Sequence, residues 1–386
     1  MKIAFLSEKY TPDIGGLAIS AERTARLLTS AGHQVHIFAP TGSLPASEAR
    51  SHASNGIRVT RFGAHKRVDD TLVDWFELLV HEHRRAPFDL IHAYFLTQAG
   101  FVGAYAARYL NILSVVSARG NDLERAIFDP SRASHILYSL QHASAVTTNA
   151  DELARKAQAL VPNLEVSVIP NGVDTGLFKP LPRNRALAES LSLISGARPE
   201  MTSRVIGFAG ELREKKGLRS LLSAYAQVTR KDPATLLIVG DVRAGEDRQA
   251  FQEFKLSNPQ AQVVVTGFVS TKDLPAYYAL MDIFVQPSLR DGLPNALLEA
   301  MACERPVLAT PVGGIVDAVL DCKNGRLVST NNADELASAM DELLTNEKLR
   351  NELGRAGRQT ILAKFTLQSE LDGNLSVYRR LGLKMQ

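Results

Sequence analysis

One segment in the second half of the chain brings together residues that could bind a sugar. Residues 286–302 read QPSLRDGLPNALLEAMA. Asp291 followed by Gly292 is typical of a turn, and Pro294 suits the first position of a helix. That helix would carry Glu299 one to two turns further on. Because a carboxylate can accept hydrogen bonds from two vicinal hydroxyls, the segment predicts a loop carboxylate and a helix carboxylate that clamp a sugar or a ribose.

A second segment, residues 208–217, has the composition of a phosphate-binding loop and reads FAGELREKKG. It follows a strand-like run and precedes a helical pattern that begins at Leu218. Arg213 offers a planar guanidinium fork and Lys216 a compact ammonium charge, and both groups bind phosphate. Most charged loops are only solvated. This loop follows the first strand of its series, at the edge where open α/β sheets bind ligands. Two interpretations therefore stay open: a phosphate-binding loop and a solvated charged loop.

A pair of glycines near the amino terminus is a weaker candidate. Gly15 and Gly16 follow the first strand-like run and precede a helix that starts at Leu17. Glycines let the backbone turn tightly and approach a ligand closely, and the helix behind them presents N–H groups to an anion. A plain strand-to-helix turn explains the same pair. The dinucleotide fingerprint G-x-G-x-x-G does not occur in the chain.

The elements that position these loops alternate along the whole chain. Apolar strand-like runs separated by amphipathic helical patterns predict parallel sheets covered on both faces, and two such series predict two doubly wound α/β domains. The predicted strands of the first series are Ile3–Leu6, Val35–Ala39, Ile57–Phe62, Asp89–Tyr94, Ile112–Ala118, Ala145–Thr148 and Val166–Ile169. Those of the second series are Val205–Gly210, Thr235–Gly240, Val263–Gly267, Ile283–Gln286, Pro306–Thr310 and Gly325–Val328.

A change in composition marks the boundary between the two series. Residues 178–183 read FKPLPR, and no strand-like run follows until residue 204. We therefore predict a first domain over residues 1–180, a linker over 181–203 with a short helix at 186–194, and a second domain over 204–365. A helical tail over 366–386 ends the chain. The crevice at the carboxyl ends of both sheets is the expected place for a ligand.

Taken together, these segments resemble the retaining GT-B glycosyltransferases of family GT4. An acidic residue, seven intervening residues and a Glu, followed by Ala-Met-Ala-Cys and PVLATPVGG, is the pattern that carries the resemblance. Further matching segments occur in the family's order: Gly15-Gly16, residues 31–35 (AGHQV), residues 169–174 (IPNGVD), Gly210 to Gly217 and residues 324–328 (NGRLV). The resemblance implies two Rossmann-like domains facing an interdomain cleft, with a C-terminal helix that crosses back to domain one.

The resemblance also implies a role for individual residues. Glu299 would hold the ribose of a nucleotide-sugar donor, and Asp291 would contact the transferred sugar. Lys216 and Arg213 would stabilise the departing diphosphate. The implied catalytic residues are Asp291, Arg213, Lys216 and Arg119. The implied donor-binding residues are Gly15, Gly16, Gly210, Arg243, Phe268, Val269, Gly292, Leu293, Pro294, Asn295 and Glu299.

The chain departs from the family pattern at three donor positions. Asp291 stands where Glu is usual, and Glu211 stands where an arginine is common, with Arg213 two residues further on. The segment that often reads His-Gly-x-Asp is Arg-Gly-Asn-Asp at 119–122. Either Arg119 takes the place of the histidine or the contact is lost. These departures bear on the identity of the sugar more than on the reaction class.

The reaction implied is transfer of a hexose-type sugar, with retention, from a nucleotide diphosphate sugar to a sugar, lipid-linked or small-molecule acceptor. UDP is the first expectation for the nucleotide because it is the commonest, with GDP and ADP open. No cofactor or metal is expected, since the family uses basic residues and a helix terminus and the chain has no Asp-x-Asp triplet. Two alternatives stay open: a GT-B nucleotide-sugar epimerase, and a non-catalytic nucleotide-sugar-binding protein.

Composition excludes several other classes. The charge balance of 44 basic against 41 acidic residues, with no basic tract longer than two, predicts no nucleic-acid binding. Two cysteines make neither a disulfide framework nor a zinc site, so a reducing cytoplasmic location is expected. Leu72, Trp75, Phe76 and Leu79 form a helical stripe. We interpret it as core, with weak peripheral contact at the inner face of a membrane as the alternative. The oligomeric state is left open.

Overall fold

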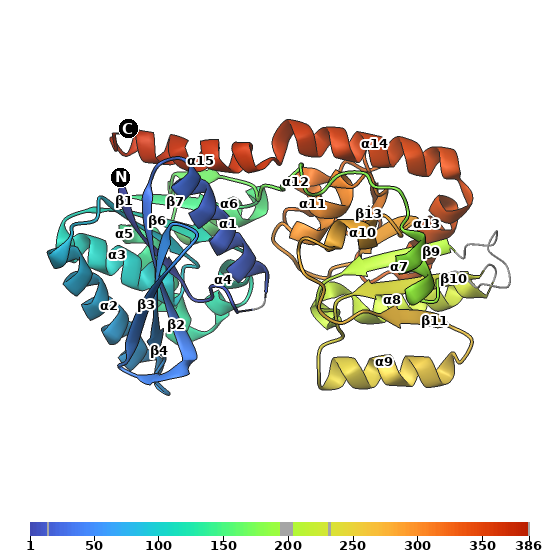
Figure 1. Cartoon of the computed structure of the whole chain (residues 1–386), viewed down its shortest axis with the longest axis horizontal. Coiled ribbons are helices and arrows are strands. Elements are labelled where there is room, and N and C mark those ends of the chain that lie inside the picture. The colour runs from blue at the N-terminus through green and yellow to red at the C-terminus, as the bar shows by residue number, and fades with distance from the viewer. Residues whose placement is uncertain (14, 194–203, 231–232, 385–386) are drawn as a thin grey trace. The chain divides into compact units, whose positions relative to one another are not determined.

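The computed structural model describes residues 1–13, 15–193, 204–230 and 233–384, and the chain divides into two compact units. The first unit comprises Met1–Asn171 and Leu367–Gln386, and the second comprises Gly172–Thr366. Each unit contains one predominantly parallel sheet with helices on both faces (Figure 1). The two parallel-sheet α/β domains predicted from the alternation of strands and helices are confirmed.

The first unit is built on an eight-stranded sheet in the order β3-β4-β2-β1-β5-β6-β7-β8. Every neighbouring pair is parallel except β3 with β4. In β1, Ile3 and Phe5 pack on one face of the sheet, and the alternate residues pack on the other, as the two-residue period of a strand requires. The strands are β1 (Lys2–Ser7), β2 (Gln34–Ala46), β3 (Ala49–Ser54), β4 (Ile57–Gly63), β5 (Leu90–Tyr94), β6 (Leu113–Ala118), β7 (Ala145–Thr148) and β8 (Val166–Val168).

The sequence prediction missed one strand of this sheet. β3 has the sequence ARSHAS, and all six of its residues are exposed. It pairs antiparallel with β4 at the edge of the sheet. β2 is also longer than predicted and runs on to Ala46 through exposed residues. Both errors have one cause, because residues of a strand that do not bury one face carry no alternating apolar pattern.

Two groups of helices cover the first sheet. α1 (Gly16–Ser30) and α15 (Leu367–Arg380) lie on one face. The opposite face is covered by α2 (Val68–Arg85), α3 (Gln98–Leu110), α5 (Pro130–His142) and α6 (Asp151–Leu160). Two shorter elements, α4 (Asn121–Glu124) and η1 (Ala126–Phe128), follow β6. On α2, Trp75 and Leu79 are fully buried, which confirms the core interpretation of that stripe.

The second unit is built on a six-stranded parallel sheet in the order β11-β10-β9-β12-β13-β14. Its strands are β9 (Arg204–Ala209), β10 (Ala234–Val239), β11 (Gln262–Val265), β12 (Ile283–Gln286), β13 (Val307–Ala309) and β14 (Arg326–Leu327). One face packs against α8 (Leu218–Thr229), α9 (Glu246–Ser257) and α13 (Ala333–Thr345). The other face packs against α10 (Leu274–Tyr278), α11 (Asn295–Ala302), α12 (Ile315–Ala318) and α14 (Glu347–Lys364).

The first unit ends earlier than the predicted boundary at residue 180. Its last residue before the tail is Asn171, because the following segment packs in the second unit. The Val173 N–H donates to the Phe365 carbonyl at 2.8 Å, and the Phe178 ring lies 6.1 Å from that of Tyr278. The predicted linker, 181–203, contains α7 (Arg185–Ser190). The rest of the predicted helix reaches residue 194, which lies outside the described residues.

The C-terminal tail belongs to the first unit, as predicted. α15 follows α14 at Leu367 and packs beside α1. The Arg23 guanidinium of α1 pairs with the buried Glu370 carboxylate of α15 at 2.7 Å. No described helix combines the length and the apolar composition that crossing a membrane requires.

Candidate functional site

In the second unit, the order in which successive strands are added to the sheet reverses between β9 and β12, and the predicted loops follow these two strands. From β9 the chain moves through β10 to β11 on one side, and it then crosses to β12 and β13 on the other. The loops that follow β9 and β12 therefore diverge from adjacent strands at the carboxyl edge. This topological switch point is where open α/β sheets bind ligands.

Glycines allow these two loops to pack backbone against backbone. The Leu289 N–H donates to the Lys215 carbonyl at 2.9 Å. Gly217 has a φ of +79°, and a Cβ built there would lie 1.9 Å from the Pro287 carbonyl oxygen. In the loop after β13, a Cβ on Gly313 would lie 1.6 Å from the Asp291 carbonyl oxygen. Both positions require glycine, so the shape of the edge depends on them.

The structure joins two predicted catalytic residues in one ion pair. The Lys216 ammonium pairs with the Asp291 carboxylate, and their side chains are only 20% and 13% exposed. The Ser288 hydroxyl also donates to Asp291, at 3.1 Å. An ammonium has three N–H donors, of which this carboxylate uses one. The side chain predicted to bind phosphate, Lys216, and the side chain predicted to bind the sugar, Asp291, are thus in contact at the switch point.

Arg213, which the sequence suggested as a substitute for the family's usual arginine, lies in the same loop. Its guanidinium pairs with Glu211 at 3.2 Å. Its Nε is buried and has no hydrogen-bond partner among the described residues. A buried donor without a partner is costly, so this nitrogen is a candidate contact for an anion. The acidic residue at 211 therefore acts on Arg213 directly.

Glu299 is oriented by a tyrosine that the sequence prediction did not single out. It lies just beyond the first turn of α11, where the Tyr278 hydroxyl donates to its Oε2 at 2.8 Å. Burial raises the pKa of Tyr278 well above its usual value, so the hydroxyl stays neutral and donates. The helix begins at Asn295, and Pro294 is its N-cap rather than the predicted first helical residue.

The other predicted donor-binding residues of this unit lie at the ends of the neighbouring strands. Gly210 follows β9, and a Cβ on Gly240 would meet the Gly210 carbonyl oxygen at 2.2 Å. Arg243 is exposed, and its N–H donates to the Leu212 carbonyl at 3.0 Å. Beyond β11, Phe268 is 77% exposed. The remaining residues of the set, at the start of α11 and beside Phe268, are buried or partly buried: Gly292, Leu293, Pro294, Asn295 and Val269.

Three predicted site residues belong to the first unit: Gly15, Gly16 and Arg119. Gly15 has a φ of +133° and is the N-cap of α1, which begins at Gly16. Arg119 follows β6, and its guanidinium lies over the ring of Tyr94, 3.8 Å from the centroid. The loop that carries Arg119 is fixed by Asp122, whose fully buried carboxylate accepts the Gly120 N–H at 2.9 Å. Burial raises the pKa of Asp122 to about 6.

Sequence reasoning missed Tyr278, Tyr94 and Ser288. Each of them contacts a predicted site residue: Tyr278 contacts Glu299, Tyr94 contacts Arg119, and Ser288 contacts Asp291. Tyr278 and Tyr94 carry no local signal, because only the fold brings them to their partners. Ser288 lies inside the segment that was singled out, three residues before Asp291. The turn expected between these two residues was the one sequence feature that could have indicated their contact.

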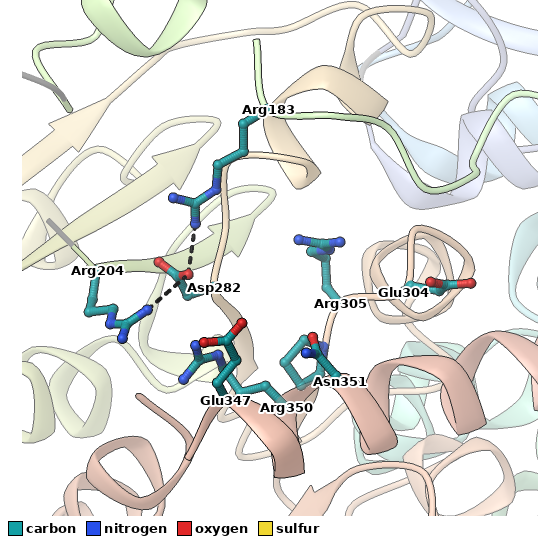
Figure 2. A pocket seen from close by; sticks show the side chains of 9 residues that line it. Arg183, Arg204, Asp282, Glu304, Arg305, Glu347, Arg350 and Asn351 are labelled. Carbon is teal, nitrogen blue, oxygen red and sulfur yellow. Dashed lines mark ion pairs between the residues drawn. The ribbon is translucent and has the colours of Figure 1, made fainter. Parts of the chain in front are cut away.

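A second cluster of charge lies at the opposite, amino edge of the same sheet. Four arginines line a pocket of about 190 Å³ there, together with Asp282 and two glutamates (Figure 2). Arg183 pairs with Asp282 at 2.7 Å. Arg305 donates to the carbonyls of Cys303 and Met281, each at 3.1 Å. Burial lowers the pKa of Arg305 from its usual value. The arginines of this pocket are thus engaged either by main-chain oxygens or by the Asp282 carboxylate.

Metal binding receives no support from the described side chains. Within the residues that the structure describes, no three His, Cys, Asp or Glu side chains are grouped so that they could hold a metal ion. The metal-independent reaction expected from the sequence stays a prediction. Cys303 is buried, and burial raises the pKa of its thiol to about 12, so it is a packing residue.

Two family models together match most of the chain. "Glycosyltransferase Family 4" matches residues 14–177, and "Glycosyl transferases group 1" matches residues 194–360. The chain belongs to glycosyltransferase family 4. A GDP-mannose-dependent alpha-mannosyltransferase of Mycolicibacterium smegmatis is 28% identical to this family member over 94% of the chain and 93% of the relative.

Solved structures show the same fold. Sucrose-phosphate synthase from Thermosynechococcus elongatus aligns with a TM-score of 0.83 at 22% identity, and 98% of each chain is covered. Anabaena HepE in complex with UDP aligns with a TM-score of 0.79 at 20% identity, over 98% of this chain and all of that one. The predicted GT-B fold is thereby confirmed.

Proposed function

We propose that this glycosyltransferase moves a hexose-type sugar from a nucleotide diphosphate sugar to an acceptor with retention of anomeric configuration. The observation that carries the proposal is the contact between Lys216 and Asp291 at the switch point. It unites a cation suited to a diphosphate with a carboxylate suited to the hydroxyls of a sugar. Glu299 lies on the helix that starts from the same loop and would hold the ribose.

The proposed chemistry depends on where charge develops. As the bond between the sugar and the diphosphate breaks, negative charge grows on the leaving phosphate and positive charge on the anomeric carbon. The unused donors of Lys216 and the buried Nε of Arg213 would stabilise the first of these charges. The Asp291 carboxylate would face the second. Because these charges are larger in the transition state than in the bound donor, their loss should affect kcat more than donor binding.

The nucleotide is open to a direct comparison. HepE, which shares the fold, was solved with UDP, whereas the mannosyltransferase relative is named for GDP-mannose. The exposed ring of Phe268 and the guanidinium of Arg243 offer a stacking surface and a polar contact for either base. UDP is our first expectation, with GDP and ADP as the other members of the donor panel.

The test is a panel of UDP-, GDP- and ADP-sugars assayed for donor hydrolysis and for transfer to added sugar and lipid-linked acceptors. The informative variant is Asp291→Asn, which keeps an oxygen acceptor for Lys216 and Ser288 and removes the charge. A charged acceptor contributes about 1.5–3 kcal/mol against about 1 for a neutral one. We therefore expect about ten-fold or greater loss of kcat, with normal folding and normal binding of the nucleoside diphosphate.

The same assays separate the alternatives. Release of an epimerised nucleotide sugar without acceptor would identify an epimerase. Tight donor binding with no turnover would identify a non-catalytic binding protein. Wild-type turnover by Asp291→Asn would mean that this carboxylate only forms the turn before α11. Asp291→Glu, which restores the residue usual in the family, should retain much of the activity if the pocket admits one more methylene.

A further inference from the structure

A tyrosine ring supports the predicted catalytic arginine of the first unit. Tyr94 is the last residue of β5, its side chain is fully buried, and the Arg119 guanidinium lies 3.8 Å from its ring centroid. Arg119 also donates to the Asn171 side-chain oxygen at 3.2 Å, whereas its buried Nε has no partner among the described residues. A planar cation on an aromatic face keeps its donors directed sideways. The ring thus fixes the plane of the guanidinium without using its N–H groups.

The hydroxyl of the same tyrosine leads away from Arg119 into a buried chain of hydrogen bonds. It lies 2.6 Å from the Thr24 hydroxyl on α1. Thr24 has one hydroxyl proton and donates it to the Glu370 carboxylate at 2.9 Å. Tyr94 must therefore be the donor to Thr24. Burial raises the pKa of Tyr94 above its usual value, which agrees with a neutral, donating hydroxyl.

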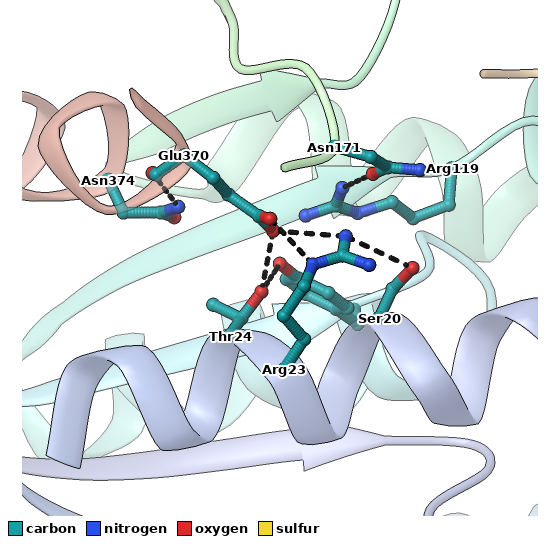
Figure 3. A network of polar contacts seen from close by, with 8 residues as sticks. Ser20, Arg23, Thr24, Arg119, Asn171, Glu370 and Asn374 are labelled. Carbon is teal, nitrogen blue, oxygen red and sulfur yellow. Dashed lines mark hydrogen bonds and ion pairs between the residues drawn. The ribbon is translucent and has the colours of Figure 1, made fainter. Parts of the chain in front are cut away.

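The chain of hydrogen bonds ends on the C-terminal helix. Glu370 of α15 is 1% exposed, and its carboxylate also receives the Arg23 guanidinium at 2.7 Å (Figure 3). Asn374, one turn later, donates to the Glu370 carbonyl at 2.8 Å. The carboxylate is thus held by two residues of α1, Arg23 and Thr24, and the Glu370 main chain is held within its own helix. Helix α15 is separated from the rest of the first unit, which ends at Asn171, by more than 190 residues of sequence. Its Glu370 nevertheless anchors the Tyr94 hydroxyl through Thr24.

We propose that Tyr94 is the positioning residue for Arg119, and that the C-terminal helix acts on the reaction through Glu370, Thr24 and Tyr94. This inference rests on the proposed function and on the role as a donor contact that the family resemblance implies for Arg119. It gives the tail a role beyond covering the sheet, because a shift of α15 would move the ring on which the guanidinium lies.

The test uses variants that separate the ring from its hydroxyl. Tyr94→Leu removes the aromatic face and should lower kcat about ten-fold. Tyr94→Phe keeps the face and loses the anchor, as does Thr24→Val, and each should lower kcat about three- to five-fold. Thr24→Ser keeps the hydroxyl and should restore the wild-type rate. Donor KM should change less than kcat throughout, since only the orientation of Arg119 is altered.

Double variants distinguish positioning from a general loss of stability. In an Arg119→Ala background, Tyr94→Phe should change kcat by less than two-fold, because the cation that it positions is gone. The matched control is Tyr225→Phe. That tyrosine is also buried, and its hydroxyl lies within hydrogen-bond distance of the carbonyl oxygens of Gln262, at 2.6 Å, and Ala234, at 2.9 Å, in the second unit. It should lower the melting temperature and leave kcat unchanged.

The outcomes are distinguishable from those that test the proposed function. If Arg119→Ala is impaired and Tyr94→Phe multiplies that loss, the tyrosine is only structural and the inference is wrong while the transferase assignment stands. If Arg119→Ala turns over at the wild-type rate, the proposed role of Arg119 fails first. The position of the cation can also be read without activity: Tyr94→Leu should abolish the ring-current shift of the Arg119 Hε resonance, and no change in that resonance would overturn the inference.

Discussion

The two edges of the second sheet differ in how they use charge. At the amino edge, four arginines line one pocket, and Arg305 is directed onto two main-chain carbonyls. Arg350 likewise donates to the carbonyls of Leu343 and Leu344, each at 2.7 Å. At the carboxyl edge, by contrast, Arg213 keeps a buried Nε that has no hydrogen-bond partner among the described residues. The edges therefore differ in how their cations are partnered, and the presence of arginines alone does not identify the site.

The polarity of the helices explains this difference. In a parallel α/β sheet the helices run opposite to the strands, so helix C-termini gather at the amino edge and helix N-termini at the carboxyl edge. Carbonyls at helix C-termini attract cations and engage them. Leu343 and Leu344 belong to the last turn of α13, and Cys303 is the C-cap of α11. Arg305 and Arg350 at the amino edge are thus structural, whereas at the carboxyl edge the buried Nε of Arg213 has no partner among the described residues.

The largest effect is expected where the carboxyl edge depends on glycine. Gly217→Ala places a Cβ 1.9 Å from the Pro287 carbonyl oxygen, so the loop carrying Lys216 must move by about 1 Å, a displacement that can reduce turnover about 100-fold. The matched control is Gly245→Ala, which has a φ of +88° and no atom within 4 Å of the added Cβ. It shares the backbone strain and lacks the clash, so it should lose stability alone.

Steady-state kinetics and thermal melting of both variants check this prediction. Equal activity of the two would show that strain, not the contact between loops, decides the effect. In that case the comparison between the edges would lose its geometric basis.

A loss of similar size is expected from Glu299→Ala. The change removes the proposed ribose clamp and leaves the buried Tyr278 hydroxyl without its acceptor. Such a loss is about 2–4 kcal/mol, or roughly 30- to 800-fold in kcat/KM. Tyr278→Phe, which retains the carboxylate and removes its orientation, should show a smaller loss. Unchanged kinetics in Glu299→Ala would mean that this side chain does not face the donor.

Much of this edge could be predicted from the sequence because its determinants are local. The turn at Asp291 and Gly292 and the loop with Arg213 and Lys216 each lie within a few residues, and the parallel sheet brings the two loops together. The pairing of Lys216 with Asp291 spans 75 residues. It was not predicted, since only the strand order places β9 beside β12.

The fold was predicted to a similar extent and for similar reasons. Buried strands such as β1 and β5 can be predicted because they are runs of mostly apolar residues. β3 is exposed throughout and gave no signal. The anchor of Tyr94 on Glu370 joins residues separated by most of the chain, and no periodic pattern encodes such a contact. Long-range polar contacts were therefore the part of the structure that the sequence could not reveal.

Single arginine variants at the two edges should have opposite effects, one on activity and the other on stability. Arg213→Ala should lower kcat about ten-fold and change the melting temperature little, because its guanidinium is partly exposed. Arg305→Ala leaves two carbonyls unsatisfied and should cost about 1–3 kcal/mol of stability with kcat unchanged. Melting curves and donor kinetics on both variants make the comparison. If Arg213→Ala leaves kcat unchanged, Arg213 only pairs with Glu211 and does not act on the donor.

The smallest effect is expected from removal of metal ions. The chain has no Asp-x-Asp triplet, and the Asp291 carboxylate that a divalent cation would need is already paired with the Lys216 ammonium. A divalent ion would have to displace that ammonium, and the carboxyl edge already supplies fixed cations for the diphosphate. Excess EDTA should therefore leave kcat and donor KM unchanged at constant ionic strength. Lys216→Ala is the informative partner, because it frees Asp291. If EDTA abolishes the activity of the wild type and Mg²⁺ or Mn²⁺ restores it, leaving-group stabilisation belongs to a metal ion, and the lysine and arginine of this edge lose the role proposed for them.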